Sequence, residues 1–435
     1  MAVGGTQSGG TGGGRRVAVV GSGVAGLVAA WALRESATVT LYEADDRLGG
    51  HAHTHDVDDP GGRPVAVDTG FIVHNRRTYP VLLRLFDELG VATQASEMSM
   101  SVSCEGCGLE YAGARRLPGL FPRARNLVTP RYLRMLGEVV RFHRRARRLL
   151  AATGADGLPD DTTLEDFARE ARFSAYFRDH FLAPLVACVW STPPATAMRY
   201  PARYLFSFLD HHGMLGISGS PRWRTVTGGS RSYVERVAKE LHEVLLGTRV
   251  ASVRRTADGV EVVDADGDLR RYDAVVVATH PHQALAVLAD PTPAEREVLG
   301  AMPYSVNPTL LHGDTSLLPS APRAAASWNY RMPRCSGGAD DVVVTYDMNR
   351  LQALDARGRY LVTLNASDRV DPTTVLDAMV YEHPIYTPES VAAQGRLAEL
   401  DDDRVVFAGA YHGWGFHEDG ARSGRAAAHR LGSTW

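Results

Sequence analysis

Three glycines near the amino end have the spacing of a phosphate-binding turn. Gly21, Gly23 and Gly26 follow a short apolar run and precede residues 27–34, which favour a helix. Such a turn lets the backbone approach a pyrophosphate closely, and the N–H groups at the helix start face the phosphates. Glu43 ends the next apolar run, where a carboxylate can hold ribose hydroxyls. The pattern predicts a dinucleotide site, and Glu43 disfavours a ribose with a 2′-phosphate.

Two further segments extend this pattern. Arg47 can offer positive charge to the phosphates, and the pair Gly49 and Gly50 leaves bare backbone beside a nucleotide. Near the carboxyl end, Gly409 ends a second apolar run, and a helix is expected to begin near Asp419.

These segments resemble the superfamily of flavin-containing amine oxidases, phytoene desaturases and protoporphyrinogen oxidases. The resemblance covers roughly half of the chain, and Asp68 and Ala278-Thr279 match it more loosely. It implies FAD, on which negative charge develops around N1 and the C2 carbonyl during reduction. A helix starting near Asp419 would stabilise that charge. Because no cysteine follows Cys335, attachment through a C-terminal cysteine is excluded, and the FAD is expected to be non-covalent.

The cofactor contacts implied by this resemblance come from both chain ends and one middle strand. They are Gly21, Gly23, Ala25, Gly26, Glu43, Ala44, Arg47, Gly49, Gly50, His51, Val250, Gly409, Phe416, His417, Glu418, Asp419 and Ser423. For Glu418 and Asp419, capping of the helix is the alternative. For Asp68, a turn-forming carboxylate that accepts backbone N–H groups is as well supported as cofactor contact.

The candidate catalytic residues lie in an aromatic loop before the C-terminal helix. They are Tyr411, His412 and Trp414. Aromatic rings can form a wall over a flavin, and His412 or His417 can move a proton near neutral pH. Ordinary loop packing explains each of these residues equally well.

Two groups of metal-binding residue types occur, and we expect no metal at either. Cys104 and Cys107 flank a Glu-Gly pair that suits a hairpin turn. A structural role is favoured over redox chemistry or zinc, because no second Cys pair or Cys/His pair completes a site along the sequence. His51, His53 and His55 would share one face of an extended strand, but their segment is predicted to be a loop beside the cofactor.

Residues 115–148 hold a strong local positive charge. The apolar positions of residues 130–150 have helical spacing, and the opposite face is basic. We expect contact with an anionic membrane surface or with a phosphate-bearing substrate, and a solvated helix face is the alternative. Against one acid, Glu138, the segment contains Arg115, Arg116, Arg123, Arg125, Arg131, Arg134, Arg141, Arg144, Arg145, Arg147 and Arg148.

The elements that must position these residues predict an α/β fold. Residues 16–43 are typical of a βαβ unit with a right-handed crossover. A polar loop follows to about residue 64. We expect helices at 80–90, 130–150 and from 419, a hairpin at 97–113, paired strands at 249–271, a buried parallel strand at 274–279 and more sheet at 305–365.

The predicted architecture is a Rossmann-like FAD-binding domain with a discontinuous α+β substrate domain. The first comprises residues 15–90, 225–290 and 395–435, and the second comprises 91–224 and 291–394, including a basic helical segment at 115–150. Residues 1–14 contain seven glycines and no apolar stretch, which is typical of a flexible tail rather than a signal peptide. We expect a cytoplasmic protein, with membrane association as the alternative.

Composition limits the function further. A chain of 435 residues with 44% hydrophobic and 22% charged residues is a folded globular protein, and its net charge of −3 gives no general attraction for nucleic acid. The resemblance implies hydride transfer from a substrate carbon to flavin N5. Amine-oxidising relatives resemble one another in a lysine that holds a water near N5, whereas the only lysine here, Lys239, lies in another region.

We therefore expect an apolar, lipid-like substrate such as a fatty-acyl or isoprenoid compound. Three alternatives remain open: a flavin amine oxidase that positions water by another group, a non-redox double-bond isomerase, and a cofactor-bound partner protein without turnover.

Overall fold

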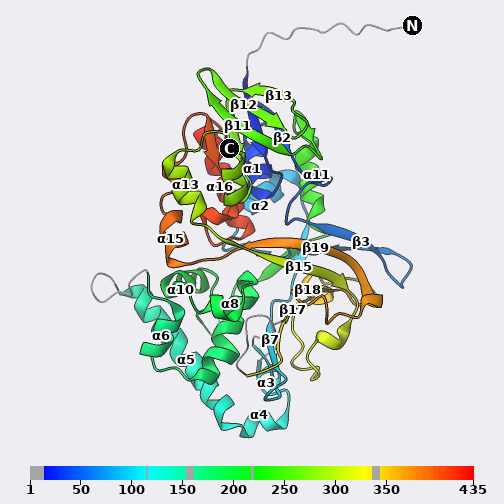
Figure 1. The fold of residues 1–435 in the computed structure, drawn as a ribbon. Coiled ribbons are helices and arrows are strands. Elements are labelled where there is room, and N and C mark those ends of the chain that lie inside the picture. Colours follow the sequence, from blue (N-terminus) through cyan, green and yellow to red (C-terminus); the bar gives the residue numbers. More distant parts are fainter. Residues whose placement is uncertain (1–13, 114–115, 153–160, 217–219, 336–342) are drawn as a thin grey trace.

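The computed structural model describes residues 14–113, 116–152, 161–216, 220–335 and 343–435. Figure 1 shows two lobes, with the carboxyl terminus in one and a group of helices around α5 (Pro130–Ala151) in the other. The long strands β15 (Tyr304–His312) and β19 (Val375–Pro384) cross the region between them.

The first lobe is built on a five-stranded parallel sheet. The continuous apolar runs predict strands buried on both faces, and the four residues of β14 are all buried. Val20 pairs with Tyr42 on one side and with Val277 on the other, and Val277 pairs with Phe407, so the strands end at one edge of the sheet. In spatial order the strands are β10 (Glu243–Leu245), β2 (Ala37–Tyr42), β1 (Arg15–Val20), β14 (Ala274–Val277) and β20 (Val405–Phe407).

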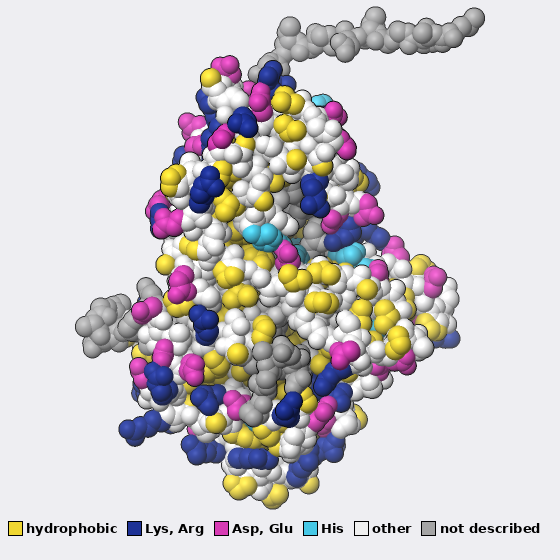
Figure 2. Space-filling model, in the orientation of Figure 1, with side chains coloured by type: hydrophobic (Ala, Val, Ile, Leu, Met, Phe, Trp, Pro, Cys, Tyr) yellow, Lys and Arg dark blue, Asp and Glu magenta, His cyan; other side chains and the backbone are white. Residues whose placement is uncertain are grey.

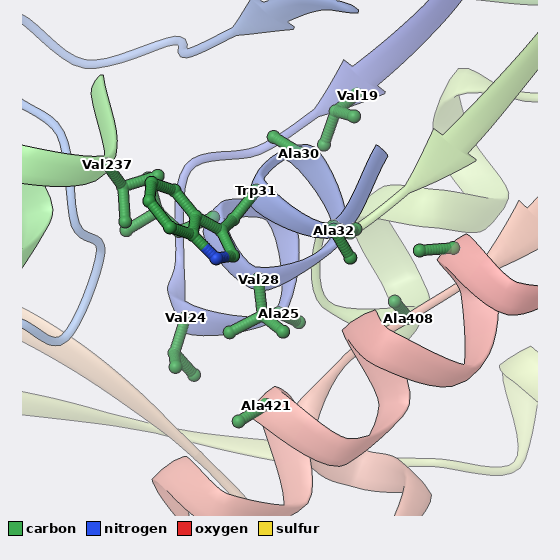
Figure 3. Packing of buried hydrophobic residues seen from close by; sticks show 14 of the residues in the cluster. Val19, Val24, Ala25, Val28, Ala30, Trp31, Ala32, Val237, Ala408 and Ala421 are labelled. Carbon is green, nitrogen blue, oxygen red and sulfur yellow. The ribbon is translucent and has the colours of Figure 1, made fainter. Parts of the chain in front are cut away.

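Two helices from opposite ends of the chain pack against each other beside this sheet. They are α1 (Val24–Leu33) and α16 (His417–Arg430). A Cβ atom at Gly424 would overlap the carbonyl oxygen of Ala25, so this glycine permits the close approach of the two helices. Figure 3 shows Ala421 of α16 beside the residues of α1 in this interface. Helix α16 begins two residues earlier than the predicted start at Asp419.

The second lobe contains a seven-stranded mixed sheet. Its strands, in order, are β19, β15, β18 (Leu361–Leu364), β17 (Val343–Asp347), β16 (Trp328–Met332), β7 (Met100–Cys104) and β8 (Leu109–Gly113). The predicted hairpin at 97–113 is confirmed as β7 and β8, and β16 pairs with β7 in the parallel direction. All strands of this sheet lie within the ranges predicted for the substrate domain, whose exact boundaries stay a prediction.

Helices cover this sheet with an aromatic core centred on Phe142, whose ring contacts Phe167, Phe177 and Phe206. The helix predicted at 130–150 is confirmed as α5. The others are α3 (Arg116–Leu120), α4 (Ala124–Val128), α6 (Leu164–Glu170), α7 (Ala175–Phe177), a π-helical turn (Arg178–Leu182), α8 (Ala183–Trp190), α9 (Pro194–Ala197) and α10 (Ala202–His211).

One loop prediction is wrong. The stretch expected to be a loop as far as residue 64 contains the antiparallel pair β3 (Thr54–Asp58) and β4 (Pro64–Asp68). In β3 the exposed Asp56 and Asp58 alternate with the half-buried His55 and Val57, as expected for a ribbon with one solvated face.

Smaller elements complete the fold. They are β5 (His74–Asn75), β6 (Thr93–Ala95), β9 (Trp223–Val226), β11 (Val250–Thr256), β12 (Gly259–Asp264), β13 (Leu269–Tyr272), α2 (Pro80–Leu89), α11 (Arg231–Lys239), α12 (Pro281–Val287), α13 (Pro293–Gly300), α14 (Met348–Leu351) and α15 (Pro388–Gln394). The helix expected at 80–90 and the paired strands expected at 249–271 are confirmed by α2 and by β11 to β13. Within the described ranges, every helix is too short or too polar to cross a membrane.

Candidate functional site

A cavity of about 710 Å³ lies at the edge where the parallel strands end, and both lobes contribute to its walls. This volume is within the range of about 300–1,000 Å³ that is usual for small-molecule and cofactor sites. The two glycine-rich motifs meet here, since Gly21 and Gly409 both line it. Figure 2 shows histidine side chains gathered midway between the lobes on one face of the molecule.

The amino-terminal turn supplies one end of the cavity. Gly21 has φ +99°, and a Cβ atom there would lie 2.9 Å from the carbonyl oxygen of Ala278. A Cβ atom at Gly26 would overlap the carbonyl oxygen of Gly21, so both glycines are required by packing. At Gly23, by contrast, no atom lies within 4 Å of the Cβ position. Gly23 is the N-cap of α1 and lines the cavity, so open space lies over a helix start.

Glu43 stands at the end of β2 beside this turn. Its Oε2 accepts a hydrogen bond from the backbone N–H of Ser22 (2.9 Å) and another from the Ser22 hydroxyl, and its Oε1 accepts one from the N–H of Asp45 (2.9 Å). Glu43, Ala44 and Asp45 all line the cavity. The carboxylate is therefore held in place while it faces the nucleotide end.

The R-x-G-G segment forms the adjoining wall. Arg47 donates to the carbonyl oxygen of Gly50 (2.8 Å), and both residues line the cavity with His51. Gly49 lies behind them and does not line it. The Nε2 atom of His51 is buried and has no hydrogen-bond partner. Burial, with His383 and His280 adding to it, lowers the pKa of His51 well below its usual value, so the ring is neutral.

The carboxyl-terminal motif closes the cavity. The Ser423 hydroxyl holds Gly409 by accepting from its N–H (2.9 Å), although Ser423 does not line the cavity itself. Phe416 and His417, at the start of α16, do line it. The His417 ring stacks on Phe71 at 3.7 Å, and burial lowers its pKa to about 3.

Two of the predicted cofactor contacts, Glu418 and Asp419, do not line the cavity. Glu418 accepts from the N–H groups of Val81 and Leu82 (both 3.0 Å) and so caps α2. Asp419 accepts from the N–H of Phe416 (3.1 Å). Both carboxyls face a second, smaller pocket, and burial raises the pKa of Glu418 to about 7 and that of Asp419 to about 6. Asp419 therefore caps the C-terminal helix as in the alternative given above, whereas Glu418 caps α2 instead.

The three candidate catalytic residues also lie in different places. Tyr411 lines the cavity, and its buried hydroxyl has no partner. Trp414 lines the second pocket instead, and His412 lines neither. Burial lowers the pKa of His412 to about 4, so it is unsuited to proton transfer near neutral pH. Val250 and Ala25 line the cavity as predicted.

The side chains of His51, His53 and His55 do not lie together in one cluster. The rings of His53 and His55 lie 4.0 Å apart, whereas His51 packs on Tyr381 and His383. Asp68 accepts from the N–H of Ser230 (3.0 Å) just before α11, which is the structural alternative given above.

Sequence reasoning missed a polar group in the cavity wall where His280, which follows β14, meets the end of β19. His280 Nδ1 lies 2.7 Å from Glu382 Oε2, and this hydrogen bond lowers the pKa of Glu382. Both residues line the cavity with Tyr381 and His383. The only signal was the sequence Tyr381-Glu-His383, a polar stretch at the end of a strand, which has no recognisable spacing.

The far end of the cavity is apolar and aromatic. Its lining includes Ile72, Val73, Met98, Val189, Trp190, Phe208, Met214, Trp223, Trp328, Tyr346, Leu364 and Val380. Lys239 is exposed at the end of α11 and does not line the cavity.

Residues 24–309, more than half of the chain, match the family described as flavin containing amine oxidoreductase. The chain belongs to this family.

Individual relatives and solved structures have low sequence identity to this chain. (S)-6-Hydroxynicotine oxidase from Paenarthrobacter nicotinovorans is 25% identical over 284 residues, which cover 64% of this chain and 63% of that protein. Carotenoid phi-ring synthase from Streptomyces griseus is 28% identical over 290 residues, covering 62% and 53%. Cyclohexylamine oxidase from Brevibacterium oxydans shares the fold with a TM-score of 0.69 at 18% identity, covering 96% and 98%.

The site fits the flavin dinucleotide of this family. The space over Gly23 would accept a pyrophosphate at the start of α1, where helix N–H groups are available. Glu43 is placed for ribose hydroxyls. The unpartnered Nε2 of His51 offers a further polar contact to a bound cofactor. The start of α16 also reaches the cavity, as stabilisation of a reduced flavin requires.

Proposed function

We propose that this protein is an FAD-dependent oxidoreductase that takes a hydride from a carbon atom of an apolar, lipid-like substrate. The character of the far end of the cavity supports this assignment. Among the described lining residues, the charged side chains other than Glu382 are Glu43, Asp45, Arg47 and Arg249, which lie near the nucleotide end. Glu382 is already paired with His280. An alkyl or polyene chain gains free energy when it leaves water for such walls.

FAD, when bound, supplies N5 as the hydride acceptor. The protein's own residues then have two tasks. The aromatic walls around Trp190 and Phe208 exclude water from the reacting carbon. The His280–Glu382 pair accepts a proton from the substrate. Because Nδ1 of His280 faces Glu382, Nε2 is the nitrogen that takes up this proton. The carboxylate of Glu382 then stabilises the resulting imidazolium.

The names of two relatives suggest different classes of substrate. Carotenoid phi-ring synthase is named after an apolar compound, whereas (S)-6-hydroxynicotine oxidase is named after an amine. An ammonium group is held most strongly by a free carboxylate, and Glu382, the lining carboxylate away from the nucleotide end, is engaged by His280. The apolar class is therefore the better match to these walls.

Anaerobic mixing of the flavin-loaded protein with candidate compounds tests the proposal. Fatty-acyl or isoprenoid compounds should bleach the flavin absorption, and amines should not. The Glu382→Gln variant should retain FAD but reduce it about 100-fold more slowly, which is typical for loss of acid–base assistance. Bleaching by amines alone would overturn the substrate class, and conversion without net bleaching would point to isomerisation.

We also propose that the protein takes this substrate from an anionic membrane. The end of the second lobe exposes Leu117 (69%), Leu127 (57%) and Val128 (76%), all on α3 and α4. Exposed arginines surround them, and Figure 2 shows hydrophobic and basic side chains together at this end. We call this surface the basic-apolar tip. It consists of Leu117, Arg123, Arg125, Leu127, Val128, Arg131, Leu133 and Arg134.

The predicted basic segment continues beyond the tip along α5, where Arg144, Arg145, Arg147 and Arg148 are exposed. Arg141 lies 3.6 Å from the buried carboxylate of Glu138 and covers the ring of Phe173. Arg115 lies outside the described residues. Apolar side chains that enter the lipid and arginines that meet its headgroups are the combination that holds a peripheral protein at a membrane.

A further inference from the structure

The turn of the β7–β8 hairpin brings four ligand-type side chains together, outside the cavity. Cys104 and Cys107 flank this turn, Cys335 follows β16, and His180 lies in the π-helical turn before α8. Their sulfur and nitrogen atoms all lie within 4.8 Å of one another. The expectation that no Cys/His pair completes the Cys104/Cys107 site is wrong, because the partners are far away in the sequence and adjacent in the fold.

The distances within this group match tetrahedral metal coordination. The sulfurs of Cys104 and Cys335 are 3.8 Å apart, and the sulfur of Cys107 is 3.6 Å from Nε2 of His180. Zinc bonds of about 2.3 Å to sulfur and about 2.0–2.1 Å to nitrogen give, at tetrahedral angles, about 3.8 Å between two sulfurs and about 3.6 Å between sulfur and nitrogen. Both measured separations therefore agree with a shared zinc ion.

The imidazole is oriented as a metal ligand. Nδ1 of His180 lies 3.1 Å from the carbonyl oxygen of Tyr176, so Nδ1 bears the hydrogen and the Nε2 lone pair faces Cys107. This is the arrangement in which a backbone carbonyl fixes the tautomer of a ligating histidine. The Tyr176 ring stacks on the His180 ring at 4.0 Å and restricts its rotation.

The backbone around the cysteines is also fixed. The N–H of Glu105 donates to the carbonyl oxygen of Met332 (2.9 Å), which ties the hairpin turn to the end of β16. A Cβ atom at Gly106 would lie 3.1 Å from the Cα atom of Arg334, so a glycine permits the turn to approach the Cys335 segment. Cys104 and His180 are almost wholly buried, and Cys107 and Cys335 are half-buried.

Nearby positive charge suits the charge of the complex. Three thiolates, one neutral imidazole and Zn²⁺ have a net charge of −1, after three thiol protons have been released to solvent. The guanidinium of Arg125 lies against Gly108 in the hairpin. Arg131 lies over the Tyr176 ring at 5.1 Å and acts electrostatically on Cys335.

We propose that Cys104, Cys107, Cys335 and His180 bind one structural Zn²⁺ ion. Four protein ligands complete a tetrahedron and leave no open position for substrate, so the site stabilises structure rather than performing chemistry. It joins three segments that are distant in the sequence: the hairpin, the helical layer and the end of β16. Through Arg125 and Arg131, it also lies beside the basic-apolar tip.

Metal analysis and X-ray absorption of the intact, flavin-loaded protein test this site. We expect about one zinc per chain, with zinc-edge scattering from three sulfurs at about 2.3 Å and one nitrogen at about 2.0–2.1 Å. Cys107→Ser and His180→Ala should each lower bound zinc at least tenfold. Cys188→Ser is the matched control, because Cys188 is buried but outside the group, and it should keep the full zinc content.

The measurements on unaltered protein decide the question even if a variant does not fold. Protein without zinc that also fails to bind Zn²⁺ or Co²⁺ after reduction would overturn the proposal. A disulfide between two of these cysteines, detected as a loss of two mass units, would overturn it as well. Iron in place of zinc, with sulfide, would replace the assignment by an iron–sulfur cluster.

Discussion

At the three glycines of the amino-terminal turn, an added methyl group would meet three different surroundings. At Gly21 and Gly26 it would collide with backbone carbonyl oxygens, and at Gly23 it would enter open space in the cavity. Glycine is therefore required for packing at Gly21 and Gly26 and for ligand access at Gly23. Substitution at the first two positions should impair folding, whereas substitution at Gly23 should impair binding.

Gly23→Ala should leave folding unchanged and weaken FAD binding. Its backbone angles, φ −60° and ψ 173°, suit alanine, so the variant should unfold at the wild-type urea concentration in the absence of flavin. FAD retention on dialysis should fall at least tenfold, because the methyl group occupies the pyrophosphate position. Gly26→Ala is the contrast and should cost about 3 kcal/mol of unfolding free energy. Normal flavin content in Gly23→Ala would contradict the placement of the pyrophosphate.

Glu418 makes stability depend on pH. Because burial raises its pKa from 4.5 to about 7, the folded state holds its proton more tightly than the unfolded state. Its contribution to stability is fully present below pH 4.5 and is lost as the pH rises through 7. Glu418→Gln should therefore lose less stability than the wild type between about pH 5 and pH 8.

Urea unfolding at the two pH values measures this difference. Glu240→Gln, a change of an exposed carboxylate, should keep the wild-type pH dependence. An unchanged pH dependence in Glu418→Gln would show that this carboxyl is already ionised near pH 5.

At the scale of elements, the crossing of α1 and α16 couples the two ends of the chain. Both helices start at the cavity, and Gly424 allows their close contact. A change that separates them therefore moves both helix starts relative to the cofactor. Stability and cofactor affinity should fall together, unlike the separate effects expected at Gly23.

Gly424→Ala tests this coupling. The methyl group would overlap the carbonyl oxygen of Ala25, and such overpacking costs about 1–3 kcal/mol. We expect a lower unfolding midpoint and a higher FAD dissociation constant, measured by calorimetry and flavin fluorescence. Ala426→Ser, at an exposed position of the same helix, is the control and should change neither quantity. Loss of stability with unchanged FAD affinity would contradict the coupling.

Elements with strong periodicity or glycine spacing were predictable from the sequence. The βαβ unit, α5 and the β7–β8 hairpin follow from local patterns, whereas the meeting of Gly21 and Gly409 at one site was implied by the family resemblance. The His280–Glu382 pair and the Cys104–Cys335 contact were not predictable. Their partners are brought together by sheet pairing across about 100 to 230 residues, and no local rule gives that register.

At the scale of the molecule, the two lobes have different proposed partners. The parallel sheet and its helix starts suit a dinucleotide, whereas the far lobe ends in the basic-apolar tip. Substrate would enter from the side of the second lobe, since its residues form the apolar part of the cavity. Orientation of the whole protein at a membrane would then bring a lipid towards the cavity.

A double variant tests the orientation. Leu127→Ser with Val128→Ser should lower binding to vesicles containing an anionic lipid at least tenfold, because burying one such side chain is worth about 1.5–3 kcal/mol. Val306→Ser with Leu269→Ser removes two other exposed apolar side chains, far from the tip in the sequence, and should bind as the wild type does. Unchanged sedimentation of the first variant would end the membrane proposal. Release of vesicles by a soluble phosphate ester would favour a phosphate-bearing substrate at the tip.

The distance in sequence between α1 and α16 has a consequence for biosynthesis. Helix α1 is buried on all sides in the finished protein, yet the helix that covers it is translated roughly 380 residues later. At about 5–20 residues per second, the ribosome leaves this apolar helix without its cover for about 20–80 s. We therefore expect the nascent chain to need chaperones, or temporary contacts within itself, until α16 emerges.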